Sequence, residues 1–241
     1  MRHSLAPGLQ SNVASGVLPN GQILLAKMFG SRHLESEELL AYEAGYRWQV
    51  TARLSLDLAS FYNVFDDADA AQLGQLELEA NPPPPHLLLP VLINNANAQR
   101  SFGAEGSMNL NLASWWKLSA AETWQQVNQI NTVGGVSKSS IGQQFSLETP
   151  HQMFNVRSTF LLPRNVEFDI GSYYVSKLVE QQVPSYTRLD VRLGWRPSPQ
   201  LELSLGGQNL LQDHHLEYGP VLGLSPTEAR RNAYARATWR F

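Results

Sequence analysis

The chain has 241 residues, a formal net charge of −3, 43% hydrophobic residues, 16% charged residues and no cysteine. The lack of cysteine excludes a disulfide framework and cysteine-ligated zinc, and the lack of a basic stripe argues against a nucleic-acid partner. No apolar run approaches the roughly 20 residues that a transmembrane helix requires, which excludes a helical span. A membrane β-strand passes this test, because it alternates apolar and polar residues.

The first predicted strands lie between residues 39 and 129. Apolar residues stand at every second position from Leu40 to Trp48, and again from Leu54 to Leu58 after a short turn near residue 50. Residues 102–112 alternate in the same way and turn near Trp115 into residues 117–129. Strict period two predicts strands with one apolar and one polar face.

Three further units follow, and the residues between their strands are typical of tight turns. Residues 154–162 and 166–170 are joined by Pro163-Arg164-Asn165, and residues 186–196 and 201–206 by Pro197-Ser198-Pro199-Gln200. In residues 186–196, charge is confined to the face of Asp190, Arg192 and Arg196. The last predicted strand runs from about residue 230 to residue 241. It adds Arg236 and Arg240 to the polar face, where we expect cross-strand pairs.

The connections differ from one end of the strands to the other. Those near residues 50, 115, 164 and 198 are tight, whereas residues 67–98, 132–149, 179–185 and 212–229 are long or irregular. Short turns at one end and long loops at the other are typical of outer-membrane barrels. We therefore predict an all-β fold: an antiparallel transmembrane β-barrel, here partial, with about nine to ten strands in residues 39–241. Residues 1–38 are expected to form an outer loop with a possible strand remnant.

The aromatic residues favour the same fold. Trp48, Trp115, Trp116, Trp195, Trp239 and Phe241 lie near the tight-turn ends, and Tyr62, Phe65, Trp124, Tyr173, Tyr174 and Tyr186 near the long-loop ends. Two such groups predict the aromatic girdles that flank the apolar band of a membrane barrel. Glu122 does not fit, because it shares a face with Leu118, Ala120 and Trp124. A bulge, or a position above the bilayer, would accommodate it.

Several motifs are similar to those of one known family. They are Glu43-Ala44-Gly45-Tyr46-Arg47 with Phe61-Tyr62-Asn63, the segment 183–195, and Asn209-Leu210-Leu211 followed by Asp213. The last strand ends in Phe241 with Ala235, Ala237 and Trp239 at alternate positions, like the C-terminal signal that the barrel-assembly machinery reads. In this order, the motifs resemble the late strands of TonB-dependent receptors over most of residues 36–241.

The resemblance implies a 22-stranded barrel in the outer membrane of a Gram-negative bacterium. Such a barrel imports a ferric siderophore or a similarly scarce nutrient, energised by TonB through an N-terminal plug. The sequence has no recognisable plug, TonB box or signal peptide. We therefore expect the chain to be a fragment whose contact with TonB depends on a missing plug, and whose other partners are outer-membrane lipid, the assembly machinery and the nutrient.

Four residues are candidates for ligand contact at the outer mouth. His214 and His215 lie near Asp213 and Glu217, and Arg230 and Arg231 are expected to attract an anionic iron chelate by their charge. A metal site at the histidines is the weaker interpretation, because receptors of this type recognise the chelate. No catalytic, metal or phosphate-binding motif is found, so neither an enzyme nor a cofactor is expected.

Two other functions are compatible with parts of the pattern. A non-transport outer-membrane barrel differs from a receptor only in the motifs around Tyr186 and Asn209. A soluble β-sandwich binding module would have strands of about 5–6 residues and loops of similar length at both ends. The long strands, the loop asymmetry and the terminal Phe241 argue against the sandwich.

Overall fold

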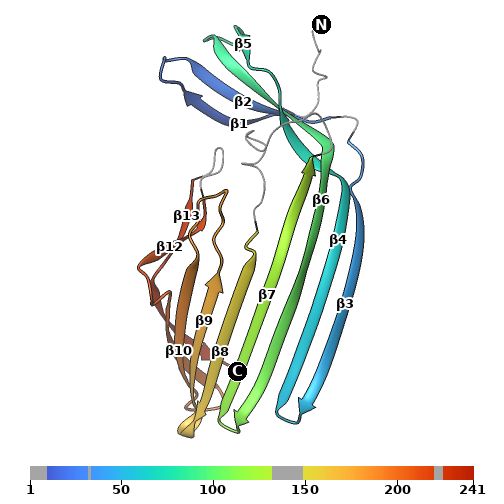
Figure 1. Ribbon diagram of the computed structural model, residues 1–241. Coiled ribbons are helices and arrows are strands. Elements are labelled where there is room, and N and C mark those ends of the chain that lie inside the picture. The colour runs from blue at the N-terminus through green and yellow to red at the C-terminus, as the bar shows by residue number, and fades with distance from the viewer. Residues whose placement is uncertain (1–9, 32–33, 132–148, 220–224) are drawn as a thin grey trace.

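The computed structural model describes residues 10–31, 34–131, 149–219 and 225–241. Nine strands stand side by side and form a curved wall (Figure 1), each antiparallel to the next. In spatial order they are β3 (Glu38–Thr51), β4 (Leu54–Leu73), β6 (His86–Ala113), β7 (Trp116–Asn131), β8 (Gln152–Leu162), β9 (Val166–Val175), β10 (Tyr186–Trp195), β11 (Leu201–Gln208) and β14 (Asn232–Trp239). This confirms the predicted partial antiparallel barrel and its strand number. Within the described segments, no helix is long and apolar enough to cross a membrane.

The wall has two chemically different faces, because register keeps like residues beside one another. Leu193 of β10 stands between Phe168 of β9 and Leu205 of β11, and its neighbour Arg192 stands between Asp169 and Gly206. A one-residue slip would exchange the two faces. We call the face of Leu193 the apolar face and the face of Arg192 the polar face.

The turns agree with the predicted asymmetry. The four tight turns lie together at the lower end of the wall in Figure 1, at residues 52–53, 114–115, 163–165 and 196–200. Arg164 and Asn165 have positive φ angles of 62° and 59°, a conformation that asparagine tolerates better than most residues. The Asn165 carbonyl accepts a hydrogen bond of 3.0 Å from the Arg196 amide, which joins two of these turns.

The prediction of a long irregular connection over residues 67–98 was wrong. β4 continues to Leu73 and β6 begins at His86, and the two remain paired as far as Leu73 opposite Val91. Register shifts between Phe65 and Ala70 break the simple alternation there, which hides the strand from a period-two search. The predicted loop over residues 212–229 contains a hairpin of β12 (His214–Tyr218) and β13 (Thr227–Arg230). Most of the predicted loop over residues 132–149 lies outside the described residues.

A smaller part of the sheet stands above the wall (Figure 1) and uses residues from the expected outer loop. The hairpin of β1 (Gln10–Val17) and β2 (Ile23–Phe29) joins β6 through a parallel pairing of β2, and β5 (Glu77–Glu79) pairs with β6 beside it. Ala26, Phe29, Leu88 and Val91 are buried there. Burial raises the pKa of the Glu79 carboxyl, but hydrogen bonds from His86 and Lys27 outweigh it and leave that pKa below its usual value.

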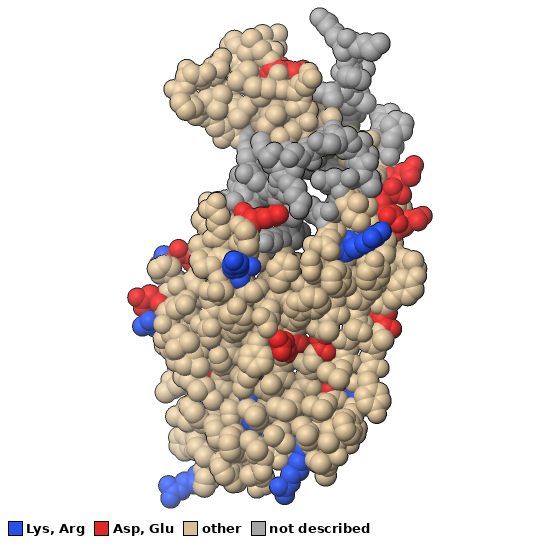
Figure 2. All heavy atoms as spheres, in the orientation of Figure 1, with Lys and Arg blue, Asp and Glu red and all other residues tan. Residues whose placement is uncertain are grey.

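Aromatic rings form belts at both ends of the apolar face. At the tight-turn end, Trp116 stacks on Phe160 at 5.6 Å and Phe160 on Phe168 at 6.1 Å. At the other end, Phe102 meets Trp124 edge-on at 5.7 Å. Figure 2 shows that charge gathers near the two ends of the wall, with a small acidic patch in the mostly uncharged band between them. Three of the aromatics expected at the upper end lie on the polar face instead: Phe65, Tyr173 and Tyr186.

Two glycines of β6 provide a test of the wall. A Cβ on Gly103 would lie 2.5 Å from the Trp124 carbonyl oxygen and 2.7 Å from the Phe61 ring, whereas one on Gly106 would meet only the end of Leu58 at 3.4 Å. We expect Gly103→Ala to destabilise the wall by about 1–3 kcal/mol and Gly106→Ala to have little effect. Urea unfolding of a closed barrel that contains this wall, assembled in vesicles and followed by tryptophan fluorescence, measures both. Equal unfolding midpoints would contradict this packing.

Candidate functional site

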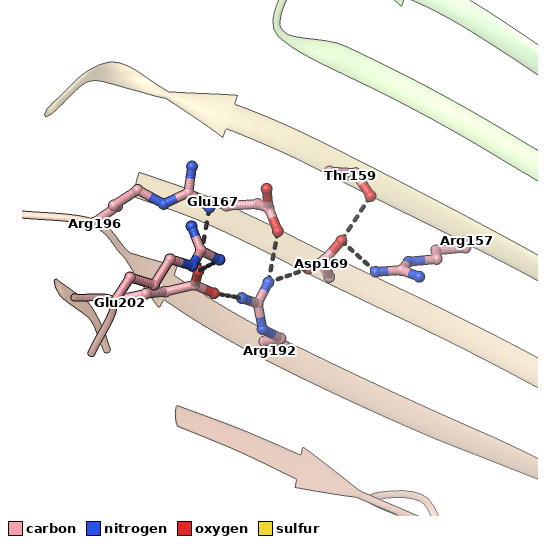
Figure 3. Close-up of polar contacts among 8 residues, drawn as sticks. Arg157, Thr159, Glu167, Asp169, Arg192, Arg196 and Glu202 are labelled. Carbon is pink, nitrogen blue, oxygen red and sulfur yellow. Dashed lines mark hydrogen bonds and ion pairs between the residues drawn. The ribbon is translucent and has the colours of Figure 1, made fainter. Parts of the chain in front are cut away.

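The polar face carries a network of charged side chains near the tight-turn end (Figure 3). Arg192 of β10 is at its centre and contacts Glu167 at 2.6 Å, Asp169 at 2.9 Å and Glu202 at 2.9 Å. These carboxylates belong to the two neighbouring strands, because register places β9 on one side of Arg192 and β11 on the other. Charge-assisted bonds of this length are strong and directional, so the network holds the three strands in register.

The network extends to strands on both sides of this centre. Asp169 is 5% exposed and also accepts hydrogen bonds from Thr159 at 2.6 Å and Arg157 at 3.1 Å, both on β8. Glu202 also meets Arg196 at 3.2 Å and Arg240, at the end of the chain, at 3.6 Å. The predicted cross-strand pairing of Arg192, Arg196 and Arg240 is confirmed. Because most charges of the network are paired with one another, the network holds neighbouring strands together.

A second region of the polar face is a shallow hollow over β3, β4, β6 and β7. Its lining includes the carboxylates Glu43 and Glu105, together with Asn63 and Ser101, which share a hydrogen bond of 3.2 Å. Phe61 packs against Gly103 at its floor, where there is no room for a side chain. No ion pair of Glu43 or Glu105 is seen in the described part of the chain. Two uncompensated carboxylates make this hollow a site for a cationic group.

A third cluster lies at the upper end of β10 and β11. Asn209 is 2% exposed and has a positive φ of 55°. Its backbone amide donates to the Asp190 carboxylate at 3.1 Å, and its side-chain nitrogen donates to the Ala229 carbonyl at 3.0 Å. The side-chain oxygen of Asn209 lies 3.2 Å from His215 Nδ1, and the His215 ring stacks on Tyr186 at 3.9 Å. Asn209 thus ties the β12–β13 hairpin to the wall.

The four predicted ligand residues lie in this hairpin or directly after it but do not converge on one point. His215 is 6% exposed and engaged with Asn209 and Tyr186, whereas His214 is exposed and stands opposite Arg230 in the strand pairing. Arg231 forms an ion pair of 2.7 Å with Asp213. In the described ranges, no group of three or more His, Cys, Asp or Glu side chains is arranged to hold a metal ion.

The last strand presents alternate residues to the apolar face. Ala235, Ala237 and Trp239 stand opposite Leu205, Leu203 and Leu201 of β11. Phe241 is fully exposed beyond the end of the strand. Sequence reasoning did not identify Glu43 and Glu105 as a pair. Both were visible only as polar positions of separate alternating segments, and strand pairing brings them to one hollow.

Arg192 and Arg236 form a matched pair of arginines on the polar face. Arg192 neutralises three carboxylates, whereas Arg236 is exposed and has no ion pair in the segments described. We expect Arg192→Met to lower the free energy of unfolding by about 1–3 kcal/mol, because three carboxylates then repel one another. Arg236→Met should change it by less than about 0.5 kcal/mol. Urea unfolding of a closed barrel that contains this wall measures both, and similar losses would show that the network does not hold the strands together.

The two adjacent histidines test the tether of the outer hairpin. His215→Ala removes the stack on Tyr186 and the contact with Asn209, so hydrogen exchange over residues 214–218 and 227–230 should become roughly tenfold faster. His214→Ala, on the exposed side of the same strand, should leave the exchange rates unchanged. If both variants exchange at the wild-type rate, the hairpin is not held through His215.

Several solved structures have a similar fold. The chain resembles the ferric-catecholate import receptor Fiu from E. coli (TM-score 0.61, 19% identity, covering 86% of this chain and 28% of that one). It also resembles the FrpB iron transporter from Neisseria meningitidis (TM-score 0.65, 13% identity, covering 89% of this chain and 33% of that one). A third similar structure is the pyoverdine receptor FpvA from Pseudomonas aeruginosa (TM-score 0.63, 16% identity, covering 86% of this chain and 30% of that one). The chain therefore spans about a third of the length of these receptors. No curated protein matches the sequence.

The family comparison covers most of the wall. A model of the TonB-dependent receptor-like β-barrel matches residues 4–210. This range includes β3 to β11, and with them the acidic hollow and the charged network except Arg240. Because the match extends over far more than half of the chain, and the solved structures share the fold, this chain belongs to the TonB-dependent receptor β-barrel family.

Proposed function

We propose that the chain forms part of the barrel wall of an outer-membrane receptor that takes up a scarce nutrient, such as a ferric siderophore, with energy from TonB. The observation that carries this proposal is the acidic hollow on the polar face, in a wall whose other face is apolar. In a barrel, the polar face lines the lumen and the apolar face meets lipid. Charged residues that do not pair with their own wall are then available to whatever occupies the lumen.

The free edges of the wall support its role as part of a larger barrel. In the segments described, β3 pairs only with β4, and β14 only with β11. Nine alternating strands leave β3 and β14 running in the same direction, so they cannot close on each other as antiparallel neighbours. An odd number of further strands would give an even-numbered closed barrel, and each unpaired backbone group in lipid costs several kcal/mol.

The hollow favours a plug with basic side chains as the occupant of the lumen. Glu43 stands opposite Phe61 of β4, and Glu105 stands opposite Ala59 of β4, so both carboxylates and the Phe61 ring line the same hollow. Carboxylates and aromatic rings both attract cations, so basic side chains of a lumen segment suit this lining. Contact with TonB is proposed to run through that plug, outside this chain.

The remaining roles follow from position along the wall. The long-loop end, with the β12–β13 hairpin, is proposed to face outward. There His214, Arg230 and Arg231 line the approach of the nutrient, and the buried His215 holds the hairpin in place. Residues 1–38 are proposed to belong to this outer region and residues 39–241 to the wall. Ala235, Ala237, Trp239 and Phe241 are proposed to be read by the barrel-assembly machinery. We infer no catalytic step and no resident cofactor.

A chimeric receptor tests the proposal. Residues 39–241 replace the corresponding last strands of the E. coli ferric-catecholate receptor, and uptake of a labelled ferric catecholate is measured in cells with and without TonB. We expect TonB-dependent uptake by a chimera that assembles into heat-modifiable barrels. An assembled chimera that takes up no ferric catecholate would favour a non-transport barrel.

The acidic hollow is tested in the same chimera. The double substitution Glu43→Gln and Glu105→Gln removes both charges and keeps the size of the side chains, so we expect uptake to fall by roughly tenfold. Glu38→Gln, on the same strand as Glu43 but at its upper end, serves as the charge-matched control and should leave uptake unchanged. Wild-type uptake by the double variant would exclude the hollow as the contact for the lumen segment.

A further inference from the structure

A pocket lies at the outer end of the polar face, where the β12–β13 hairpin meets the connection between β9 and β10. Leu178 and Val183 form its apolar part; they are 7% and 3% exposed and share two backbone hydrogen bonds of 2.9 Å. Gly219, after β12, packs so closely on Gln181 that it leaves no room for a side chain. The volume of about 270 Å³ is slightly below the roughly 300 Å³ at which pockets for whole ligands begin, so it suits one arm of a molecule.

Glu217 gives this pocket a negative charge. It is the only charged side chain among the described residues that line the pocket, and it is 48% exposed. The register of β12 and β13 shifts between Leu216 and Tyr218, so Glu217 has no partner residue on β13. A shift of this kind re-aims a side chain. Within the described ranges, no Lys or Arg forms an ion pair with Glu217, and His215 is its one charged-group neighbour, at 3.5 Å.

His215 does not neutralise this carboxylate. Because the Asn209 side-chain nitrogen donates to the Ala229 carbonyl, its oxygen faces His215 Nδ1 at 3.2 Å, and Nδ1 carries a proton. A doubly protonated ring would also donate from Nε2 to Glu217, but the buried Nε2 has no hydrogen-bond partner among the described residues. In the neutral ring Nε2 is an acceptor. Two acceptors, His215 Nε2 and Glu217 Oε1, therefore lie 3.5 Å apart with no donor between them.

A protonated amine fits these surroundings better than other groups. It supplies the missing positive charge, and its three N–H donors are enough for both acceptors. The rings of Tyr186 and Tyr218, which also line the pocket, attract cations on their faces. The carbon chain of the amine would lie against the buried leucine and valine. An anion would be repelled by Glu217, and a hard metal ion would require several oxygen ligands.

We propose that the pocket of Glu217, Tyr186, Tyr218, Leu178 and Val183 binds a protonated amine carried on an apolar arm of the nutrient. The proposal rests on the proposed function in taking the bound molecule to be the nutrient. Arg230 lies on β13, the other strand of the hairpin. A nutrient with an anionic centre and a cationic arm would therefore find a partner for each charge at the outer end, and one without an amine would leave Glu217 unpaired.

Binding of three small probes to the closed chimeric barrel is the first test. The probes share a fluorophenyl ring and differ in charge: 4-fluorophenethylamine, the neutral 4-fluorophenethyl alcohol and the anionic 3-(4-fluorophenyl)propanoate. Fluorine NMR line widths, titrated against the purified chimera and corrected with empty detergent micelles, give the dissociation constants at pH 7. We expect the amine to bind about tenfold more tightly than the alcohol, and the carboxylate more weakly than both. Equal affinity of the amine and the alcohol would overturn the proposal.

Variants of the chimera assign the preference to the pocket. Glu217→Gln keeps the size of the side chain but should abolish the tenfold preference, whereas Glu228→Gln, on the same hairpin but outside the pocket, should keep it. Tyr218→Leu retains the carboxylate and should halve the preference, and it serves as the test if Glu217→Gln does not assemble. A preference that persists in both pocket variants would refute the site.

The outcomes for the pocket and for the proposed function are separable. A chimera that prefers the amine but takes up no ferric catecholate would support the pocket and count against the transport role. A chimera that takes up ferric catecholate with no preference for the amine would overturn the pocket alone.

Discussion

The register of the backbone hydrogen bonds between neighbouring strands is the constraint on which the rest of the structure depends. Along each strand the side chains alternate between two faces, and the register with the neighbouring strand decides which residues lie on which face. Leu193 therefore lies beside Phe168 and Leu205, and Arg192 beside Asp169. The aromatic belts, the charged network, the acidic hollow and the exposed Glu122 are all consequences of which residues this register places on the same face.

Charge is distributed unequally over the polar face. Toward β14 it is compensated within the wall, where Arg192, Asp169 and Glu202 connect strands from β8 to the end of the chain. Toward β3, Arg47 pairs with Asp57, but Glu43 and Glu105 of the hollow have no ion pair among the described residues. One half of the wall thus connects its strands through ion pairs, and the other half carries two carboxylates that no described residue neutralises.

The outer end is built differently from the wall. Its hairpin, β12–β13, is tethered by a few specific contacts. The buried Asn209 makes two of them, to Ala229 and His215, and its backbone amide also bonds to Asp190 of the wall. A positive φ at this residue turns the chain out of β11, which explains why an asparagine suits the position. The buried His215 contacts Asn209 and stacks on Tyr186, so it belongs to the same set of contacts. His214 and Arg230 are exposed, and Arg231 forms an ion pair with Asp213.

The sequence by itself determined the strands, their two faces and their tight turns, because these depend on residues two to five positions apart. The alternation around Arg192 and the proline turn at residues 197–199 are local signals of this kind. Only the tertiary structure decided the continuation of β4 and β6 past their register shifts and the parallel pairing of β2 with β6. It also brought Glu43 and Glu105 to one hollow, buried His215 against Tyr186, and placed Gln152 beside Glu122. These features join residues that are 18 to 63 positions apart, a separation over which period-two alternation carries no information about which strands pair.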